Sequence, residues 1–480
     1  MSILVIDVGT SSVRAGVVRP DGTVEHIHQQ PLPPTVPFPG LVEFDPAAMA
    51  EAALGAARAA LADAGPVDAV GVTAQRASAV AWDATSGKPL GPGIGWQDLR
   101  TAGTCLELQP EGIRLGPSET ALKWTWLLDN HDPDRSASTR VGTVECWMAW
   151  QLTEGALHVT DASNAGVTGL LQLDGSNWDL DLAERLRIPA AALPRIVDSI
   201  GPLGPATALP GGPALAGLIG DQQASLIGQG CTRPGLGKAT FGTGGMLDLC
   251  IGGSGPTEAA RGPHGCIPVV AWRQGGSVTW GLEAIMLSAG SAVDWLVEDL
   301  GILANADESA AVAAACEDTE GVVMVPAMLG FGTPSWDFGA RGLLIGLSRG
   351  SGRAQVTRAV LEGIAHEGAD LLEAVEAESG LALDHLRVDG GMSTNGVFLQ
   401  ALADACRRPI EVSPEREATT LGAGYLAGIA VGTWSGLDDV AEAWSPREVI
   451  EPRENETRER WQRAVARARE WYPELSALQF

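Results

Sequence analysis

The chain has 480 residues, more than the roughly 250 to 300 at which a single hydrophobic core stops growing, so we expect two domains. Apolar residues make up 45% of the chain and charged residues 19%, which excludes an intrinsically disordered protein. The formal net charge of -27 opposes binding to nucleic acid phosphates and to anionic lipid head groups, so we expect neither as a partner.

Cysteine usage and the N-terminus indicate a cytoplasmic protein. The seven cysteines are odd in number and form no C-x-x-C pair, which argues against a disulfide framework and against a zinc site. The opening MSILVIDVGTSS has no basic segment before an apolar stretch, and no apolar run approaches the roughly 18 residues of a membrane span.

The first half of the chain alternates strands and helices. ILVIDVG at 3–9 and VRAGVV at 13–18 predict two strands, and the turn RPDG followed by TVEHI extends them into an antiparallel meander. From Pro46 to Gly65 the alanine-rich sequence predicts a helix, and DAVGVTA at 68–74 predicts another strand. Because this alternation continues to about Gln229, the fold class is α/β.

The second half repeats this layout. KATFGTGGMLDLCI at 238–251 again places two strands around a corner of Gly and Thr. Later, 321–327 and 386–391 predict strands, 357–380 a long helix, and 454–471 an amphipathic helix on the outside of this half. We therefore expect a duplicated fold with a central cleft and a boundary near 228–236, which divides the chain into domains 1–231 and 232–480.

Two corners rich in Gly and Thr predict phosphate loops. DVGTSS at 7–12 and FGTGG at 241–245 let the backbone approach an anion closely and present N–H groups to it. Either corner alone is also ordinary turn sequence, but one at the start of each half favours a nucleotide between the halves. Asp7, at the end of the first strand, is a candidate to hold Mg²⁺ through water.

Asp221 is the candidate general base. It follows an apolar strand and precedes a predicted helix, a position that a helix-capping aspartate also favours. An alcohol that attacks a phosphoryl group loses its proton late, and a carboxylate can accept that proton and orient the oxygen. Since Asp221 lies at the junction of the two halves, where a cleft is expected, the sequence predicts a kinase that acts on a hydroxyl group.

Three other interpretations remain. GLGKAT at 235–240 lacks the complete P-loop pattern and is interpreted as turn sequence. GLSRG at 346–350 matches the nucleophile elbow of a serine hydrolase with Ser348, but only His366 and His385 follow it, and His366 lies in the adjoining helix. A sugar-sensing binding protein is the third class, and it would need no base.

Motifs along nearly the whole chain resemble the FGGY carbohydrate kinases. They include DVGTSSVRAGV, GLVEFDP, GVTAQR, WQDLRT, SETALKWTWLLDN, GTVECWMAWQLT, HVTDASNA, GDQQASLIGQG, FGTGG, WDFGARGLLIGLSRG and VDGGMSTNG. GLSRG falls inside one of the two long patterns of that family, which disfavours the hydrolase. The resemblance implies two duplicated domains like those of actin, Hsp70 and hexokinase (ribonuclease H-like), which close over ATP and a small sugar or polyol.

The resemblance also implies roles for individual residues. The first domain would bind the acceptor and carry the first phosphate loop, while the second would bind the nucleotide. Asp221 matches the base and Asp7 the position near Mg²⁺, and Asp294 falls where glycerol kinases have Gln. The matching nucleotide positions are Thr10, Ser11, Ser12, Arg14, Gly242, Thr243, Gly290, Asp294, Gly391 and Asn395.

The motifs of this chain resemble those of the glycerol kinases most, but the predicted acceptor pocket differs from theirs. Its candidate residues are Gln75, Arg76, Trp96, Ser118, Asp221, Gln222 and Met246. Where those kinases have Glu, Tyr and Phe, this chain has Ala77, Ser118 and Met246. Because lost hydrogen-bond partners and lost bulk change specificity, we expect a polyol or ketose larger than glycerol; a glycerol kinase proper and a xylulokinase-like ketose kinase are the alternatives. A homodimer and a monomer both remain open.

Overall fold

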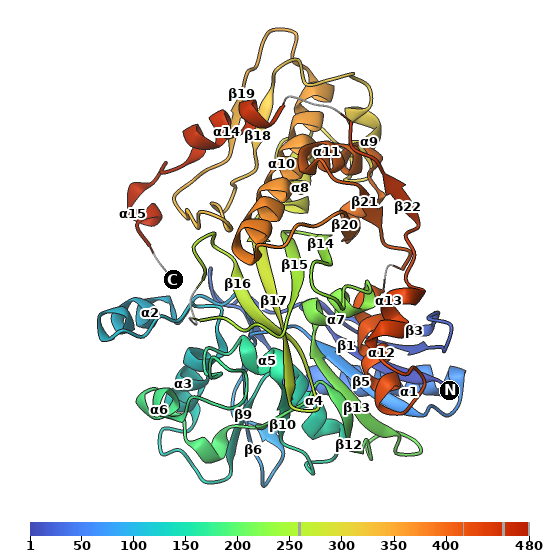
Figure 1. Cartoon of the computed structure of the whole chain (residues 1–480). Helices are drawn as coiled ribbons and strands as arrows, with labels where there is room; N and C mark the ends of the chain where they lie inside the picture. Colours follow the sequence, from blue (N-terminus) through green and yellow to red (C-terminus); the bar gives the residue numbers. More distant parts are fainter. Residues whose placement is uncertain (258–260, 416, 454–456, 479–480) are drawn as a thin grey trace.

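Two large mixed sheets organise the computed structural model, which describes residues 1–257, 261–415, 417–453 and 457–478. Figure 1 shows one sheet in the lower part of the molecule and the other in the upper part. We call the part built on the sheet with β1 the first lobe and the part built on the sheet with β14 the second lobe. The predicted α/β fold class is confirmed.

The first sheet has six strands in the order β12-β13-β5-β1-β2-β3. β1, β2 and β3 form the predicted antiparallel meander, β5 and β13 add to β1 in parallel, and β12 closes the edge antiparallel. The strands span Ile3–Val8 (β1), Ser12–Val18 (β2), Val24–Pro31 (β3), Ala69–Ala74 (β5), Ile200–Pro205 (β12) and Ala214–Gly220 (β13).

The second sheet repeats this pattern. Its order is β16-β17-β15-β14-β20-β21-β22, with β14, β15 and β17 antiparallel, β20 and β21 parallel to β14, and β22 antiparallel at the edge. The strands span Gly237–Phe241 (β14), Gly245–Gly252 (β15), Ile267–Gln274 (β16), Ser277–Met286 (β17), Leu386–Asp389 (β20), Ile410–Val412 (β21) and Glu448–Ile450 (β22). Apart from the additional β16, each strand has a counterpart in the first sheet, which confirms the duplicated design.

Helix α1 (Pro46–Ala64) covers one face of the first sheet. The Asp45 side chain caps it by accepting from the N–H groups of Ala47 and Ala48, and Gly65 ends it, as the sequence predicts. Its alanines pack on the apolar side chains of β1 and β5, and α4 (Val144–Leu152) adds to the same core.

The other face of the first sheet carries α7 (Asp221–Gly228) and α12 (Ala418–Ala430). The two helices cross at glycines: a Cβ on Gly228 would lie 1.9 Å from the Ala418 carbonyl oxygen, and one on Gly422 would lie 1.8 Å from that of Ala224. Although α12 comes from the second half of the sequence, it packs in one core with β1 and β13. This contact holds α7, which begins at Asp221, against α12.

Helices α10 (Arg353–Ser379), α11 (Gly396–Cys406) and α8 (Gly290–Glu298) pack against the second sheet in one large core. α10 ends at Gly380, whose φ of 69° suits a residue without a Cβ, as predicted. The predicted C-terminal helix is α14 (Thr457–Ala468), since 454–456 lie outside the described residues. It lies across β18 and β19 with Trp461 buried, which confirms its place on the outside of this lobe (Figure 1).

Shorter elements connect these parts. The strands are Glu43–Phe44 (β4), Val80–Asp83 (β6), Lys88–Pro89 (β7), Gly93–Ile94 (β8), Thr139–Gly142 (β9), Val159–Asp161 (β10), Arg195–Val197 (β11), Val323–Val325 (β18) and Leu343–Ile345 (β19). The helices are Ala102–Leu108 (α2), Thr120–His131 (α3), Ala162–Gly166 (α5), Leu180–Arg185 (α6), Glu308–Ala313 (α9), Leu437–Ala443 (α13) and Pro473–Ser476 (α15).

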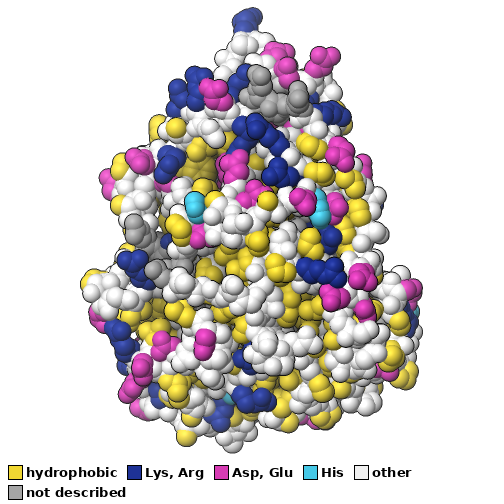
Figure 2. Space-filling view, viewed as in Figure 1, with side chains coloured by type: hydrophobic (Ala, Val, Ile, Leu, Met, Phe, Trp, Pro, Cys, Tyr) yellow, Lys and Arg dark blue, Asp and Glu magenta, His cyan; other side chains and the backbone are white. Residues whose placement is uncertain are grey.

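The surface, the thiols and the helices add three observations. Figure 2 shows basic and acidic side chains interspersed over both lobes on the face in view. All seven cysteines are free thiols, and all but Cys316 are buried. Within the described residues, no helix combines the length and the apolar character that a membrane crossing requires.

Candidate active site

Asp221 lies where the two lobes meet, at the first position of α7 and directly after β13, as predicted. Its Oδ1 lies 3.3 Å from Nε of Arg76 and accepts a 2.8 Å hydrogen bond from the Gln222 N–H. The side chain is 30% exposed, so a ligand can reach the carboxylate. Burial raises the pKa of Asp221, against the opposing effects of Arg76 and the Gln222 N–H, and this makes it a stronger proton acceptor.

Arg76 connects the lobes through a buried ion pair. It follows β5, and its Nη2 donates to Oε2 of Glu283 on β17 over 2.6 Å. The same nitrogen lies 4.0 Å from the Met246 sulfur, so the predicted pocket residues Arg76 and Met246 do come together. Nη1 of Arg76 is buried and has no hydrogen-bond partner among the described residues. Because buried donors are rarely left unpaired, Nη1 is an unsatisfied donor on the side chain that lies beside Asp221.

Asp7 brings a second carboxylate into the cleft. It is the second-to-last residue of β1, is 7% exposed, and pairs in register with Arg14, whose Nε lies 3.5 Å from its Oδ2. Arg14 also pairs with Glu417, just before α12. Burial raises the pKa of Asp7 to about 7; Arg14 opposes this shift, whereas the charges of Asp221 and Glu417 add to it. The Asp7 corner therefore concentrates negative charge.

The corner between β1 and β2 contacts the indole of Trp96. Trp96 follows β8, is 36% exposed, and donates from Nε1 to the Thr10 hydroxyl over 3.0 Å. The carbonyl of Ser11 accepts from the Leu32 N–H, and the hydroxyl of Ser12 accepts from Gln29. The structure thus brings a predicted acceptor contact against a predicted phosphate loop.

Lys238 lies inside β14 and is fully buried, so the interpretation of GLGKAT as turn sequence was wrong beyond Leu236. The physical reason is a partner directly across the strand pair: Asp248 faces Lys238 in the β14–β15 register, and its Oδ2 lies 2.8 Å from Nζ. Nζ also donates to the hydroxyl of Thr240 over 2.9 Å and to Oε1 of Gln222 over 2.7 Å. Lys238 therefore orients the side chain next to Asp221.

The second corner is open and uncharged. Gly242 and Thr243 are exposed between β14 and β15, and the start of α8 packs against them. The N–H of Gly290 donates to the Gly242 carbonyl over 2.8 Å, and the N–H of Ser291 donates to that of Thr243 over 3.1 Å. A Cβ on Gly290 would lie 2.6 Å from the Gly242 oxygen. Asp294 lies one turn further along α8 and is exposed.

The loop after β20 lies beside this corner, because β20 runs parallel to β14. Gly391 is exposed and begins a short 3₁₀ helix, so its backbone is accessible to a ligand. The Asn395 side chain instead caps α11: its Oδ1 accepts from the N–H groups of Val397 and Phe398, and its Nδ2 donates to Ser309.

The remaining predicted acceptor residues occupy different environments. Gln75 is 2% exposed, and its side chain accepts from the Ser78 hydroxyl over 3.3 Å. Ala77 has φ of 60°, an uncommon conformation for a residue with a Cβ. Ser118 is exposed just before α3. Since Ala77 and Ser118 have small side chains, they leave space where bulkier residues would fill it.

Ser348 has no catalytic partner in the described residues. Its hydroxyl contacts Ser351 and accepts from the Gly350 N–H, while His366 stacks on Trp461 and His385 pairs with Glu411. The hydrolase hypothesis therefore finds no Ser–His pair here.

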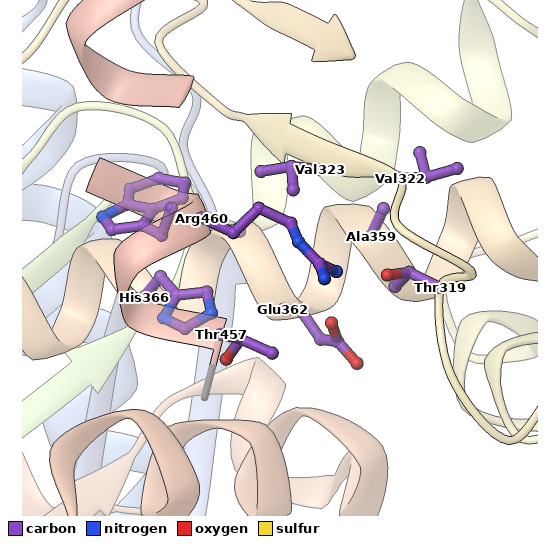
Figure 3. Close-up of a pocket in the computed structure, with 10 residues that line it drawn as sticks. Thr319, Val322, Val323, Ala359, Glu362, His366, Thr457 and Arg460 are labelled. Atoms are coloured by element: carbon purple, nitrogen blue, oxygen red, sulfur yellow. The ribbon is translucent and has the colours of Figure 1, made fainter. Parts of the chain in front are cut away.

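Two cavities lie outside the group around Asp221. The smaller, of about 20 Å³, lies between α10, α14 and β18; Figure 3 shows His366 and Glu362 of α10 at its lower side and Val322 and Val323 at its upper side. The larger, of about 730 Å³, lies between the lobes, with Leu115 and Glu119 of the first lobe facing Trp280 of the second. Glu119 is the neighbour of Ser118, and burial raises its pKa to about 7.

Several important side chains were missed from the sequence. Glu283, Lys238 and Asp248 are single charges inside otherwise apolar strands, and this isolation was the available signal. A buried charge is costly unless it is paired, so such residues predict partners. The sequence does not say which charge pairs with which, because the partners come from different strands or lobes.

Comparisons with known proteins cover both halves. Residues 2–228 match the N-terminal domain of the FGGY family of carbohydrate kinases, and residues 237–431 match its C-terminal domain. A glycerol kinase of Aromatoleum aromaticum is 41% identical, with 98% of this chain and 99% of that protein covered. A glycerol kinase of Deinococcus radiodurans is 37% identical, with 99% of each chain covered.

Solved structures show the same architecture. A Plasmodium falciparum glycerol kinase with ADP superimposes with a TM-score of 0.90 at 26% identity, covering 100% of this chain and 99% of that one. A xylulose kinase from Rhodospirillum rubrum gives a TM-score of 0.83 at 25% identity, with 99% of each chain covered.

Proposed function

Because the chain belongs to the FGGY family of carbohydrate kinases, we propose that it transfers the γ-phosphate of ATP to a hydroxyl group of a polyol or ketose larger than glycerol, with Asp221 as the general base. The observation that carries this proposal is the arrangement at the cleft. A reachable carboxylate with a raised pKa lies beside an arginine with an unpaired buried donor.

The acceptor binds on the first lobe in this scheme. Its reacting hydroxyl lies against Asp221, which accepts the proton and orients the oxygen for in-line attack. Arg76 donates from Nη1 to a neighbouring hydroxyl, and the indole of Trp96 covers the C–H face of the acceptor. Ordering the hydroxyl next to the phosphate supplies much of the catalysis, since this reaction depends on positioning.

The nucleotide binds on the second lobe through backbone groups. The backbones of the exposed residues Thr243 and Gly391 offer N–H groups to phosphate oxygens without requiring a cationic side chain, whereas the N–H of Gly242 already donates to the Gly244 carbonyl. Binding through the backbone suits a chain with a net charge of -27, because nearby main-chain dipoles offset the negative charge of a phosphate locally. Closure of the lobes excludes water that would otherwise hydrolyse ATP.

The residues around Asp7 fit a magnesium ion. Asp7 offers hard oxygen ligands, and its pKa of about 7 reflects burial together with nearby negative charge that a cation would offset. In the described residues no group of three or more His, Cys, Asp and Glu could hold a metal, so the nucleotide would complete the ligand set. The ion would neutralise charge on the transferring phosphoryl group.

The size of the acceptor follows from the small side chains. Ala77 and Ser118 remove the carboxylate and the phenol of a glycerol pocket, and Met246 replaces a rigid ring beside Arg76. Each hydrogen-bond partner lost to glycerol costs roughly 1 to 3 kcal/mol.

Glycerol is the second candidate, because the curated relatives at 37% and 41% identity are glycerol kinases. A panel of glycerol, longer polyols, ketoses, aldoses and sugar acids, assayed by coupled ADP release, separates the two. We expect kcat/KM for a larger polyol or ketose to exceed that for glycerol by about tenfold or more. A higher value for glycerol would contradict the larger acceptor, and no transfer to any compound would contradict a kinase.

A matched variant sharpens the panel. The combined substitutions Ala77→Glu, Ser118→Tyr and Met246→Phe restore to the pocket the bulk and the hydrogen-bond partners for glycerol that this chain lacks. The variant should raise kcat/KM for glycerol and lower it for the larger acceptor. An unchanged ranking of acceptors would show that these positions do not set specificity.

A further inference from the structure

Lys123 is a fully buried cation without a carboxylate partner. It lies in the first turn of α3, is 0% exposed, and makes no ion pair with any described residue. Its Nζ instead donates to backbone carbonyl oxygens of Ser118 over 2.7 Å, Ala77 over 2.9 Å and Trp96 over 3.4 Å. All three N–H groups of the ammonium are therefore directed at main-chain acceptors.

These carbonyls come from separate loops. Ala77 follows Arg76 after β5, Trp96 follows β8 and contacts Thr10, and Ser118 precedes α3. Along the sequence, Ala77 is 46 residues from Lys123, Trp96 is 27 residues away and Ser118 is 5 residues away. They are the loops that form the acceptor side of the proposed site, so one ammonium group joins three walls of the same pocket.

Stability alone does not account for a lysine here. Taking an ammonium out of water costs several kcal/mol, whereas a methionine would fill a similar volume in the apolar core around α3 without that cost. Burial also lowers the pKa of Lys123 to about 7, although Asp98, Glu119 and Cys105 favour the charged form, while Arg100 opposes it. The group is thus held at an energetic cost that its three hydrogen bonds must offset.

Ala77 shows what these bonds achieve. Its φ of 60° costs roughly 1 kcal/mol for a residue with a Cβ, and a strained conformation persists only where its surroundings fix it. The bond from Lys123 to the Ala77 carbonyl holds this peptide, and Arg76 is the preceding residue. Because this carbonyl belongs to the peptide between Ala77 and Ser78, the bond fixes the backbone directly after the residue that follows Arg76 and limits how far the Arg76 loop can move.

We propose that Lys123 is a positioning residue that sets the shape of the acceptor pocket by holding the carbonyls of Ala77, Trp96 and Ser118 at one point. Lys123 touches neither acceptor nor nucleotide and acts through Arg76 and Trp96. This inference rests on the proposed function, since it assigns the three loops to acceptor binding. It predicts a defect in acceptor affinity that nucleotide affinity does not share.

The test compares Lys123→Met with Thr125→Val. The first variant keeps the length of the side chain and removes all three donors. Thr125 lies on the same helix, and its hydroxyl donates to the carbonyls of Ala121 and Leu186, away from the pocket, so its variant controls for loss of stability in α3. For Lys123→Met we expect the acceptor KM to rise about tenfold or more and the ATP KM to stay within about twofold. For Thr125→Val neither KM should change.

A second variant keeps the test decisive if Lys123→Met does not fold. Lys123→Gln retains two N–H donors for three carbonyls, so its acceptor KM should lie between those of the wild type and Lys123→Met. An unchanged acceptor KM in a folded Lys123 variant, or equal rises in both KM values, would overturn the positioning role. The acceptor is whichever compound the wild type phosphorylates best; a wild type that phosphorylates none overturns the proposed function itself.

Discussion

The two sides of the proposed site, which we assign to the acceptor and to the nucleotide, are built differently. The acceptor side is dense in buried charge, with Arg76 between Glu283 and Asp221 and with Asp7 nearby. The nucleotide side consists of exposed glycine and threonine backbone at Gly242, Thr243 and Gly391, with no charged side chain at the corner itself.

The two sides must therefore preserve different properties. A neutral hydroxyl group is recognised by directional hydrogen bonds, which need particular charged partners in fixed places. A phosphate chain is recognised by many main-chain N–H groups, which need only a close approach. Changes of charge should therefore damage the acceptor side, and changes of volume should damage the nucleotide side.

Glu283→Gln should have the largest effect among substitutions outside the proposed base. Removing one partner of a buried ion pair costs roughly 3 to 5 kcal/mol, because Arg76 is left buried and loses its fixed direction. We expect kcat/KM for the acceptor to fall at least about 10²-fold, with the ATP KM changing less than about threefold. Steady-state kinetics with each substrate varied in turn gives both values.

Arg233→Gln is the control for this variant. It breaks an ion pair with Asp438 in which both side chains are at least half exposed, and such pairs contribute little. If both variants left the kinetics unchanged, the buried pair would have no part in acceptor binding.

Asp7→Asn tests whether the burial of a charged carboxylate, with Asp221 and Glu417 nearby, reduces stability. The folded pKa of about 7 lies above the unfolded 3.8, so the stabilising contribution is complete below about pH 4 and is lost as the pH rises through 7. At about pH 8 the variant should be more stable than the wild type without nucleotide, by at most about 4 kcal/mol. The difference should disappear near pH 4. Urea unfolding at both pH values measures it, and a variant less stable at pH 8 would contradict the account.

Gly290→Ala should affect the opposite side of the cleft and by a smaller amount. The added Cβ would meet the Gly242 carbonyl at 2.6 Å and push the second corner out of place. Overpacking of this kind costs roughly 1 to 3 kcal/mol, so we expect the ATP KM to rise about tenfold while the acceptor KM stays constant. Gly253→Ala, with no atom within 4 Å of the added Cβ, is the control. A rise in the acceptor KM instead would remove the distinction between the two sides.

Local features of the fold could be predicted from the sequence. The strands around Gly9 and Gly242 are short apolar runs separated by Gly and Thr, and such runs need no distant partner to be recognised. The ends of α1 and α10 follow from Asp45, Gly65 and Gly380, which act on their own helices. The position of Asp221 between β13 and α7 is local in the same sense.

Pairings between distant segments could not be predicted. Arg76 and Glu283 are 207 residues apart and meet only because the lobes meet, and Lys238 reaches Gln222 from the other half of the chain in the same way. Likewise, the packing of α12 on the first sheet depends on the glycine crossing with α7. The roles assigned to the individual nucleotide and acceptor residues remain predictions.

The most direct test of the account is the rate of phosphate transfer in Asp221→Asn, measured in a single turnover with saturating ATP and acceptor. Asparagine preserves the size of the side chain but cannot accept the proton of the hydroxyl. We expect a rate about 10² to 10⁴ times lower, with an unchanged ATP KM and a melting temperature no lower than that of the wild type. A variant that transfers phosphate at the wild-type rate would contradict the assignment of Asp221 as the base.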